Sequence, residues 1–236
     1  LLSTVDATTV TAGFDVATSI ASVVTVSNTA AVVAGSAFTL TSLTDTFVGG
    51  AGADVFTADN TATASASSTA DSLTGGAGAD TLNIFSDGSV DPMPVVSSIE
   101  TINLYDVDDA IFTTATAADV TTLNVIRGDG NAQGVIVAAG TTVNLSTITL
   151  AEVGTSVSVT HAAATTSATI GVDGVVGDAD ATFTEDVTLV GAGLTTVVVN
   201  ATGTASDIES LIVAGATDVT INAAVKFSAA NTANGV

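Results

Sequence analysis

The chain has 236 residues and a formal charge of −22, because 24 acidic residues face only two basic ones, Arg127 and Lys226. Contacts with nucleic acid or with an anionic membrane surface need clusters of Lys and Arg, so this balance excludes both classes of partner. With 47% hydrophobic residues and a mean hydropathy of +0.62, the chain has enough apolar material for a core, which excludes disorder of the low-hydrophobicity kind.

The apolar residues are mainly Ala and Val, with 4% aromatic residues and neither Trp nor Cys. The absence of cysteine excludes disulfide bonds and thiolate chemistry. No apolar run approaches the roughly 18–20 residues of a membrane span, so we expect no membrane insertion. The chain begins at Leu1 and not at Met. We therefore expect a fragment or a processed product, with any export signal outside it.

Three regions follow one another along the chain. Residues 1–40 alternate small and β-branched positions and are predicted to form short strands. Residues 41–92 contain an internal Gly/Asp repeat, and residues 93–236 form a Thr/Val/Ala-rich scaffold of strands. Within this scaffold, 113–119 and 205–210 could each hold a single helical turn. We expect the three regions as the domains of the protein.

Short strand-like phrases recur at intervals of roughly 10–20 residues in the last region. They are residues 99–104, 121–126, 141–145, 156–160, 186–189, 195–199 and 218–221. Each alternates apolar residues with Thr, Ser or Asn, which is the period of a strand. Such strands form a sandwich, a barrel or a solenoid, and the likeness of phrases such as TTLNV and TTVNL favours stacked rungs. The predicted fold is all-β, a parallel β-roll or β-solenoid.

Two nearly identical nonapeptides carry the chemistry. Residues 49–57 read GGAGADVFT and residues 75–83 read GGAGADTLN. Both fit G-G-x-G-x-D-x-U-x, where U is a large apolar residue, the calcium-binding nonapeptide of parallel β-rolls. The glycines permit a tight turn whose carbonyl oxygens point inward, the Asp adds a carboxylate, and U enters the core. The glycines of the two turns are Gly49, Gly50, Gly52, Gly75, Gly76 and Gly78.

Four aspartates follow the same period. Asp45 lies nine residues before Asp54, and Asp71 lies nine residues before Asp80. Each glycine-rich nonapeptide is thus preceded by a degenerate copy in phase. Calcium takes 6–8 oxygen ligands, more than one turn supplies, so stacked turns would share an ion. The predicted metal ligands are these four carboxylates, together with backbone carbonyls of the six glycines.

These residues resemble the repeats-in-toxin (RTX) calcium-binding family, which Gram-negative bacteria export by type I secretion. The stretch 71–83, followed by VSSIETINL at 96–104, is similar within that family to bacterial surface-layer proteins. The motif match covers residues 40–105, and the remainder matches in composition and style. The resemblance implies calcium-dependent folding outside the cell and, for surface-layer members, assembly into a sheet. Two good and two degenerate copies indicate calcium clips within a larger β scaffold.

Other polar residues give weaker indications. The single histidine, His161, lacks the nucleophile and orienting acid of a triad, so no catalytic role is expected for it. Acidic clusters at 106–109 and 173–186 indicate solvated turns or further cation sites. Glu100 is either a solvent-facing strand residue or a support for a nearby ion. Two formal N-glycosylation sequons occur at residues 144–146 and 200–202.

We expect a structural protein and not an enzyme. It would be a subunit of a calcium-dependent surface layer or filament on the bacterial cell surface, assembling with copies of itself. Bound Ca²⁺ would neutralise aspartates in the turns and let subunits of charge −22 approach one another. One alternative is an adhesin that binds cell-surface polysaccharide, and another is the non-catalytic repeat domain of a secreted hydrolase. Ice binding by a flat Thr array is a weaker alternative, because the Thr spacing is irregular.

Overall fold

Strands are the regular structure of this protein. The computed structural model describes residues 4–6, 15–16, 24–27, 34–61, 65–86, 92–106, 111–114, 116–129, 133–150, 156–177 and 186–235. Every regular element in these ranges is a β-strand, which confirms the all-β prediction. Over the same ranges, no helix is long and apolar enough to cross a membrane. The chain divides into two compact units, one of residues 1–87 with 91–104 and the other of residues 88–90 with 105–236.

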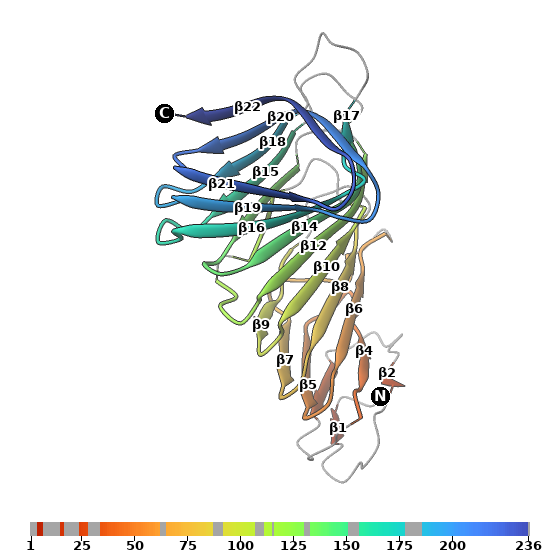
Figure 1. Ribbon diagram of the computed structural model, residues 1–236. Helices are drawn as coiled ribbons and strands as arrows, with labels where there is room; N and C mark the ends of the chain where they lie inside the picture. Colours follow the sequence, from red (N-terminus) through yellow and green to blue (C-terminus); the bar gives the residue numbers. More distant parts are fainter. Residues whose placement is uncertain are drawn as a thin grey trace. The chain divides into compact units, whose positions relative to one another are not determined.

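The first unit contains two parallel sheets (Figure 1). One sheet has the order β1-β3-β5-β7-β9, and the other joins β2, β4, β6 and β8. The bounds are β1 Thr4–Asp6, β2 Asp15–Val16, β3 Val24–Ser27, β4 Ala37–Thr39, β5 Asp45–Gly50, β6 Val55–Asp59, β7 Ser72–Gly76, β8 Thr81–Phe85, β9 Val95–Ser97 and β10 Thr101–Tyr105. Because these strands pair in parallel with the strand two places further along the chain, the chain forms stacked coils, which confirms the β-solenoid.

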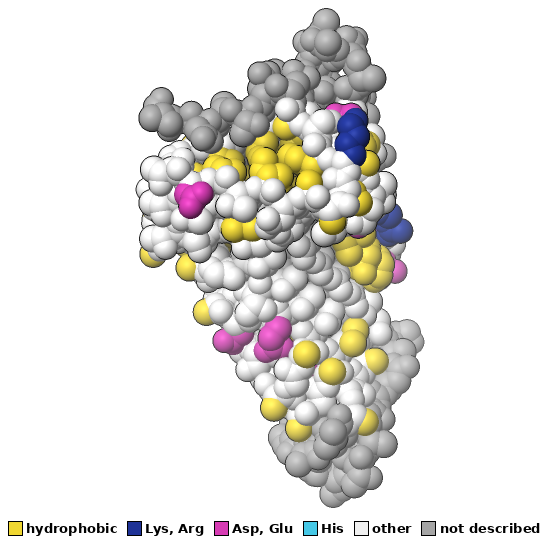
Figure 2. Space-filling view, in the orientation of Figure 1, with side chains coloured by type: hydrophobic (Ala, Val, Ile, Leu, Met, Phe, Trp, Pro, Cys, Tyr) yellow, Lys and Arg dark blue, Asp and Glu magenta, His cyan; other side chains and the backbone are white. Residues whose placement is uncertain are grey.

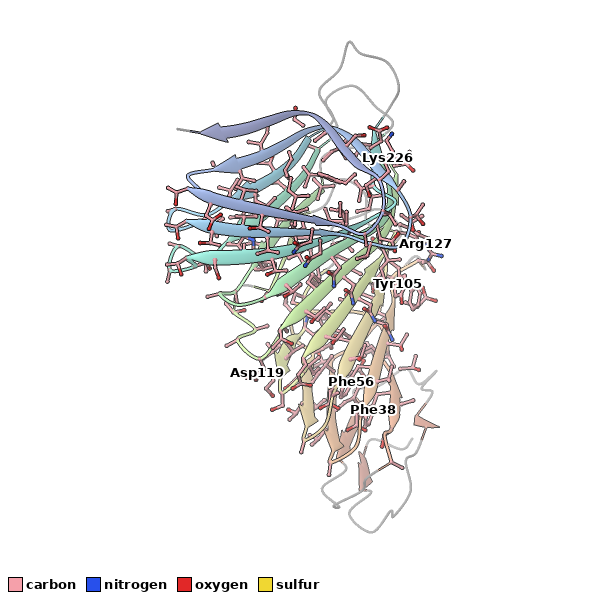
Figure 3. All side chains as sticks on the ribbon, viewed as in Figure 1. Phe38, Phe56, Tyr105, Asp119, Arg127 and Lys226 are labelled. Atoms are coloured by element: carbon pink, nitrogen blue, oxygen red, sulfur yellow. The ribbon has the colours of Figure 1, made fainter. Side chains whose placement is uncertain are left out.

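The large apolar residues of the repeats form the core of this unit. Phe47, Phe56, Leu73 and Leu82 are each 0% exposed, as expected for the U position of the nonapeptide. Phe38 stacks on Phe56 (Figure 3), with ring centroids 4.8 Å apart. Phe38 also stacks on Phe47. Alternation of these residues with Thr and Val on each strand buries one face of each sheet between the two.

The strands of the second unit also pair in parallel. Their bounds are β11 Ile111–Thr113, β12 Thr122–Asp129, β13 Gln133–Val137, β14 Thr142–Leu150, β15 Ser156–His161, β16 Ser167–Asp173, β17 Val176–Gly177, β18 Asp186–Val190, β19 Thr196–Ala201, β20 Ser206–Ala214, β21 Asp218–Ala223 and β22 Phe227–Gly235. These include strands at the predicted positions 121–126, 141–145, 156–160, 186–189, 195–199 and 218–221.

Each full coil of the second unit has three strand segments. The first segment stacks β12, β14, β16, β19 and β21 in register. The second stacks the ends of β12 and β14, then β17, then the starts of β20 and β22. The third stacks β11, β13, β15, β18 and the ends of β20 and β22. Branched aliphatic residues such as Leu123, Val143 and Ile170 fill the interior at no more than 1% exposure.

A stacked corner separates the first segment from the second. Arg127, Thr147, Gly174 and Gly203 occupy it with φ between 55° and 65°, a left-handed conformation that costs free energy for the two non-glycine residues. Arg127 forms an exposed ion pair of 2.8 Å with Asp106, and its guanidinium lies over the ring of Tyr105 (Figure 3). Exposed pairs of this kind contribute little stability, so the aliphatic interior holds the coil together.

The expectation of a helical turn at 205–210 was wrong. Ser206–Ala214 is strand β20, because parallel pairing with β18 and β22 outweighs the local sequence preference. At 113–119, Thr113 ends strand β11, and turns follow it, with Ala117 N–H donating to the carbonyl of Thr114. The predicted region boundaries at residues 40 and 92 stay predictions. They were drawn from the motif content of the sequence, whereas the two units are defined by contacts within the structure, so the two divisions do not test one another.

Gly76→Ala tests the close stacking of turns in the first unit. A Cβ at Gly76 would lie 2.0 Å from the carbonyl oxygen of Gly50, and the residue has φ +108°. We expect the strained backbone to cost about 1–2 kcal/mol and the overlap to add about 1–3 kcal/mol. Gly140→Ala is the matched control, because Gly140 also has positive φ but its Cβ would meet no atom within 4 Å. Denaturant unfolding that found equal losses for the two variants would contradict the stacking.

Candidate metal centre

A column of polar residues runs through the first unit, one residue per coil. Ser36, Asp54, Asp80 and Glu100 lie at or just before the starts of β4, β6, β8 and β10. We call this set the Asp54 column. Both aspartates are buried, with 1% of Asp54 and 0% of Asp80 exposed. The stacking of coils thus places carboxylates in a row inside the protein.

Hydrogen bonds link the members of the Asp54 column. Ser36 N–H donates to Asp54 Oδ1 over 2.6 Å, and Asp54 N–H donates to Asp80 Oδ1 over 2.7 Å. Asp80 N–H in turn donates to Glu100 Oε2 over 2.8 Å. Each carboxylate therefore binds the backbone of the coil before it, and a charged acceptor makes these bonds stronger than neutral ones.

The second oxygen of each aspartate in this column is different. Asp54 Oδ2 and Asp80 Oδ2 are buried and have no hydrogen-bond partner among the described residues. Each lies against a glycine: a Cβ on Gly49 would be 2.3 Å from Asp54 Oδ2, and a Cβ on Gly75 would be 2.4 Å from Asp80 Oδ2. An unpaired buried carboxylate oxygen is costly, so both positions call for a positive partner.

Backbone carbonyl oxygens lie near the same Cβ positions of these glycines. The Cβ position of Gly49 is 2.6 Å from the carbonyl oxygen of Gly75, and that of Gly75 is 1.9 Å from the carbonyl oxygen of Ser98. Any side chain at Gly49 or Gly75 would fill the space that these oxygens border. Carboxylate and carbonyl oxygens therefore gather around both glycines.

The glycine turns themselves stack backbone on backbone. Ala77 N–H donates to the carbonyl of Gly50 over 2.8 Å, and a Cβ at Gly78 would lie 2.2 Å from the carbonyl oxygen of Gly52. Gly50 and Gly78 have φ of 123° and 146°, which side chains rarely permit. The repeat therefore needs glycine both for its backbone conformation and for the close approach of successive coils.

The Asp45 column, which consists of Asp45 and Asp71, has a different environment. Asp71 accepts hydrogen bonds on both oxygens, from the N–H groups of Asp45 and Ser68. Asp45 accepts the N–H of Thr41 over 2.6 Å and the Thr41 hydroxyl over 3.1 Å. These two carboxylates hold the turns and adjoining strands, and the open oxygens lie in the Asp54 column. The prediction that Asp45 and Asp71 are also ligands stays a prediction.

Burial raises the pKa of all four aspartates. It raises the pKa of Asp45 to about 6 from 3.8, against the hydrogen bonds from Thr41, and the charge of Asp71 adds to the increase. Burial likewise raises the pKa values of Asp54 and Asp71, and the charges of Asp54 and Glu100 further raise the pKa of Asp80. Ionisation of these carboxyl groups is therefore less favourable in the folded protein than in water, and a bound cation would offset that cost.

The donors of the Asp54 column fit calcium. Ca²⁺ prefers hard oxygen ligands and accepts carboxylates and backbone carbonyls together. The residues that would hold it are Asp54 with Gly75 and Asp80 with Ser98, through the open carboxylate oxygen and the carbonyl oxygen in each case. No group of three or more His, Cys, Asp or Glu side chains converges on a metal site in the described part of the chain. Carbonyl oxygens or water would therefore complete the coordination.

Sequence reasoning missed one member of the Asp54 column and left another undecided. Ser36 occupies the aspartate position of a coil without a full motif. It is linked to Asp54 by a hydrogen bond from its backbone N–H, which its side chain does not reveal. Glu100 supports the column, as one of its two readings suggested. Of the acidic clusters, Asp106 pairs with Arg127, whereas positions 107–110 and 178–185 lie outside the described residues.

His161 lies in the interior of the second unit. It is 3% exposed, and neither ring nitrogen has a hydrogen-bond partner within the described ranges. Burial lowers the pKa of its imidazole, so the ring is neutral at pH 7. The absence of a catalytic role for His161 stays a prediction.

With calcium chelated, we expect stability to fall as the pH rises from about 4 to about 7. The folded-state pKa values are raised, to about 6 for Asp45, so the folded protein holds these protons more tightly than the unfolded chain. The stabilisation is complete below the unfolded pKa and is lost as the pH rises through the folded one. Thermal melting with and without excess Ca²⁺ measures this, and calcium should stabilise more at about pH 7.5 than at about pH 4.5, because it binds ionised carboxylates.

The general charge of the protein also varies with pH, so a charge-matched control is needed. Asp54→Asn with Asp80→Asn should reduce both the pH dependence and the calcium effect. Asp119→Asn with Asp218→Asn changes the charge equally at two exposed positions and should preserve both. A calcium effect that stays the same in the two double variants would show that the Asp54 column is not the site.

Comparisons with known proteins bear on the same segment. A family model described as the RTX calcium-binding nonapeptide repeat matches residues 41–62 and 63–83. No curated protein matches the chain. No solved structure matches it either. Residues 41–83 are thus similar to RTX calcium-binding nonapeptide repeats, and calcium is the ion that such repeats bind, which confirms the expectation of Ca²⁺.

Proposed function

We propose that this protein is a structural subunit of a calcium-dependent extracellular assembly, a surface layer or a surface filament. The observation that carries the proposal is the pair of open, buried carboxylate oxygens of Asp54 and Asp80, each beside a stacked glycine turn. They make the folding of the first unit depend on a cation. Calcium-binding repeats in a β-solenoid suit a structural module whose order is set by the calcium around it.

The first step in this mechanism occurs within one chain. The Asp54 column already ties four successive coils to one another by three N–H to carboxylate hydrogen bonds of 2.6–2.8 Å. A bound Ca²⁺ supplies the positive charge that the open oxygens lack. The chain's own residues hold the coils in register, exclude side chains from the glycine turns and keep Asp54 and Asp80 away from water. The result is a rigid module.

The second step occurs between chains. At a charge of −22, two copies repel one another, and the chain's two basic side chains, Arg127 and Lys226, are each already paired with an aspartate. In Figure 2 each of the two basic side chains has acidic atoms beside it, and further acidic groups lie at other places on the face shown. Divalent cations reduce such repulsion far more than monovalent ones do. Assembly of this protein would therefore require calcium, as folding of the first unit does, and both would take place outside the cell.

Electron microscopy of the purified chain, with excess calcium and after chelation, tests this function. We expect ordered sheets or filaments with calcium and their dissolution on chelation. Asp54→Asn with Asp80→Asn should abolish assembly, whereas Asp119→Asn with Asp218→Asn, which changes the net charge equally, should not. Separate, uniform particles in both conditions would contradict the proposal. An intact lattice from the Asp54/Asp80 variant would show that assembly does not depend on the Asp54 column.

A further inference from the structure

Two rows of outward-facing residues cross the first strand segment of the second unit, whose strands lie side by side in Figure 1. The amide row consists of Asn124, Asn144, Gly171, Asn200 and Asn222, which are direct partners from β12 to β14, β16, β19 and β21. The strand neighbours of the first four residues are buried, and Asn222 is itself exposed, so the row faces outward. Four of its five positions are asparagine, and the central one is glycine.

The asparagine side chains form a directed ladder that Gly171 interrupts. Asn144 Nδ2 donates to Asn124 Oδ1 over 2.8 Å, and Asn222 Nδ2 donates to Asn200 Oδ1 over 3.0 Å. Both bonds run towards the lower-numbered strand. At Gly171 no side chain is present to continue the ladder. Asn144 Oδ1 and Asn200 Nδ2 therefore have no hydrogen-bond partner within the described ranges, one acceptor and one donor on opposite sides of the gap.

Asn144 leans into this gap. A Cβ at Gly171 would lie 2.3 Å from Asn144 Oδ1, so the acceptor sits over the glycine. Neighbouring strands are about 4.8 Å apart, which places Asn144 and Asn200 about 9.6 Å from one another across Gly171. The space between them has the width of one missing amide.

A groove opens at the gap. Its volume is about 390 Å³, within the roughly 300–1,000 Å³ range of small-molecule sites. Three members of the amide row line it, Asn124, Asn144 and Gly171, and Asn200 is the strand partner of Gly171 on the next coil. The groove is also lined by a second row two residues further along each strand: Ile126, Ser146, Asp173 and Thr202. The groove therefore offers side-chain amides along the first row, with Asn200 flanking its Gly171 position, and hydroxyl and carboxylate groups along the second row.

A secondary amide matches the gap. Its carbonyl would accept from Asn200 Nδ2, its N–H would donate to Asn144 Oδ1, and these two groups point in opposite directions across a trans amide. The hydroxyls of Ser146 and Thr202 and the carboxylate of Asp173 suit the hydroxyl groups of a sugar ring. Asp173 and the net charge of −22 disfavour an anionic ligand.

We propose that the groove at Gly171 binds the acetamido group of a neutral N-acetylated amino sugar, with Asn144 and Asn200 as its hydrogen-bond partners. The same two rows account for the sequons at 144–146 and 200–202. Asn in the amide row is followed two residues later by Ser or Thr in the second row, so the pattern arises from strand geometry. The groove lies in the second unit, and its test is independent of calcium-dependent assembly.

Titration of the isotope-labelled full chain in calcium with N,N′-diacetylchitobiose, followed by NMR, tests the site. We expect the side-chain amide signals of Asn144 and Asn200 to shift. Cellobiose, which has hydroxyls in place of the acetamido groups, should bind roughly tenfold or more weakly, because two amide hydrogen bonds are lost. Equal binding of the two sugars, or no binding of either, would overturn the proposal.

Gly171→Asn fills the gap with the side chain that continues the ladder. Its Cβ would displace only the amide end of Asn144, so the coil should fold. We expect the variant to lose chitobiose binding by roughly tenfold or more. Asn103→Ala removes the hydrogen bond between Asn103 and Asn83 in the first unit, and this control variant should bind chitobiose like the unchanged protein. Retained chitobiose binding by Gly171→Asn would refute the site. The site would also be refuted if the amide signals of Asn144 and Asn200 shifted with protein concentration in the absence of sugar, because a second copy of the chain would then be the occupant.

Discussion

The first unit depends on one interaction, the hydrogen bond between a buried carboxylate and the backbone N–H of the coil before it. This bond fixes the register of the coils, because the donor and the acceptor lie at equivalent positions one coil apart. It also fixes where the negative charge goes. One oxygen of Asp54 or Asp80 is used by the backbone, and the other is left in a dry environment between glycine turns. The structure of the turn therefore creates the requirement for a cation.

Both units are built from stacked parallel strands, but different interactions stabilise each of them. In the first, stacked phenylalanine and leucine residues are combined with carboxylate columns and glycine turns. In the second, branched aliphatic residues fill a three-sided coil, and asparagine ladders and left-handed corners order its surface. Calcium thus binds in the first unit, where buried carboxylates accompany the apolar core. The second unit, which lacks the nonapeptide repeat, is held together by its aliphatic interior.

The sequence predicted the parts of this structure that repeat. Alternation in phrases such as 121–126 and 195–199 identified strands, and the likeness of the phrases identified the solenoid. The nonapeptides located Asp54, Asp80 and the glycine turns, because glycine and aspartate have specific roles at fixed spacing.

What could not be predicted depends on distances along the chain that vary. Equivalent positions of the Asp54 column are 18, 26 and 20 residues apart. The longest coil contains a loop held by Asn60, whose side chain accepts the N–H groups of Ala66 and Ser67. No fixed period reveals that Ser36 and Glu100 belong to the column. The amide row was hidden for the same reason, since Asn144, Gly171 and Asn200 are 27 and 29 residues apart and meet only through strand register.

The most direct test of the central claim is hydrogen exchange of backbone amides, measured by mass spectrometry in excess calcium and after chelation. The amides of Ser36, Asp54 and Asp80 donate to the carboxylates of the column, so segments 34–61 and 65–86 should lose most of their protection when calcium is removed. Segments 133–150 and 186–214 of the aliphatic coil should change much less. Equal protection of the first unit with and without calcium would contradict the account, because its buried carboxylates would then need no cation.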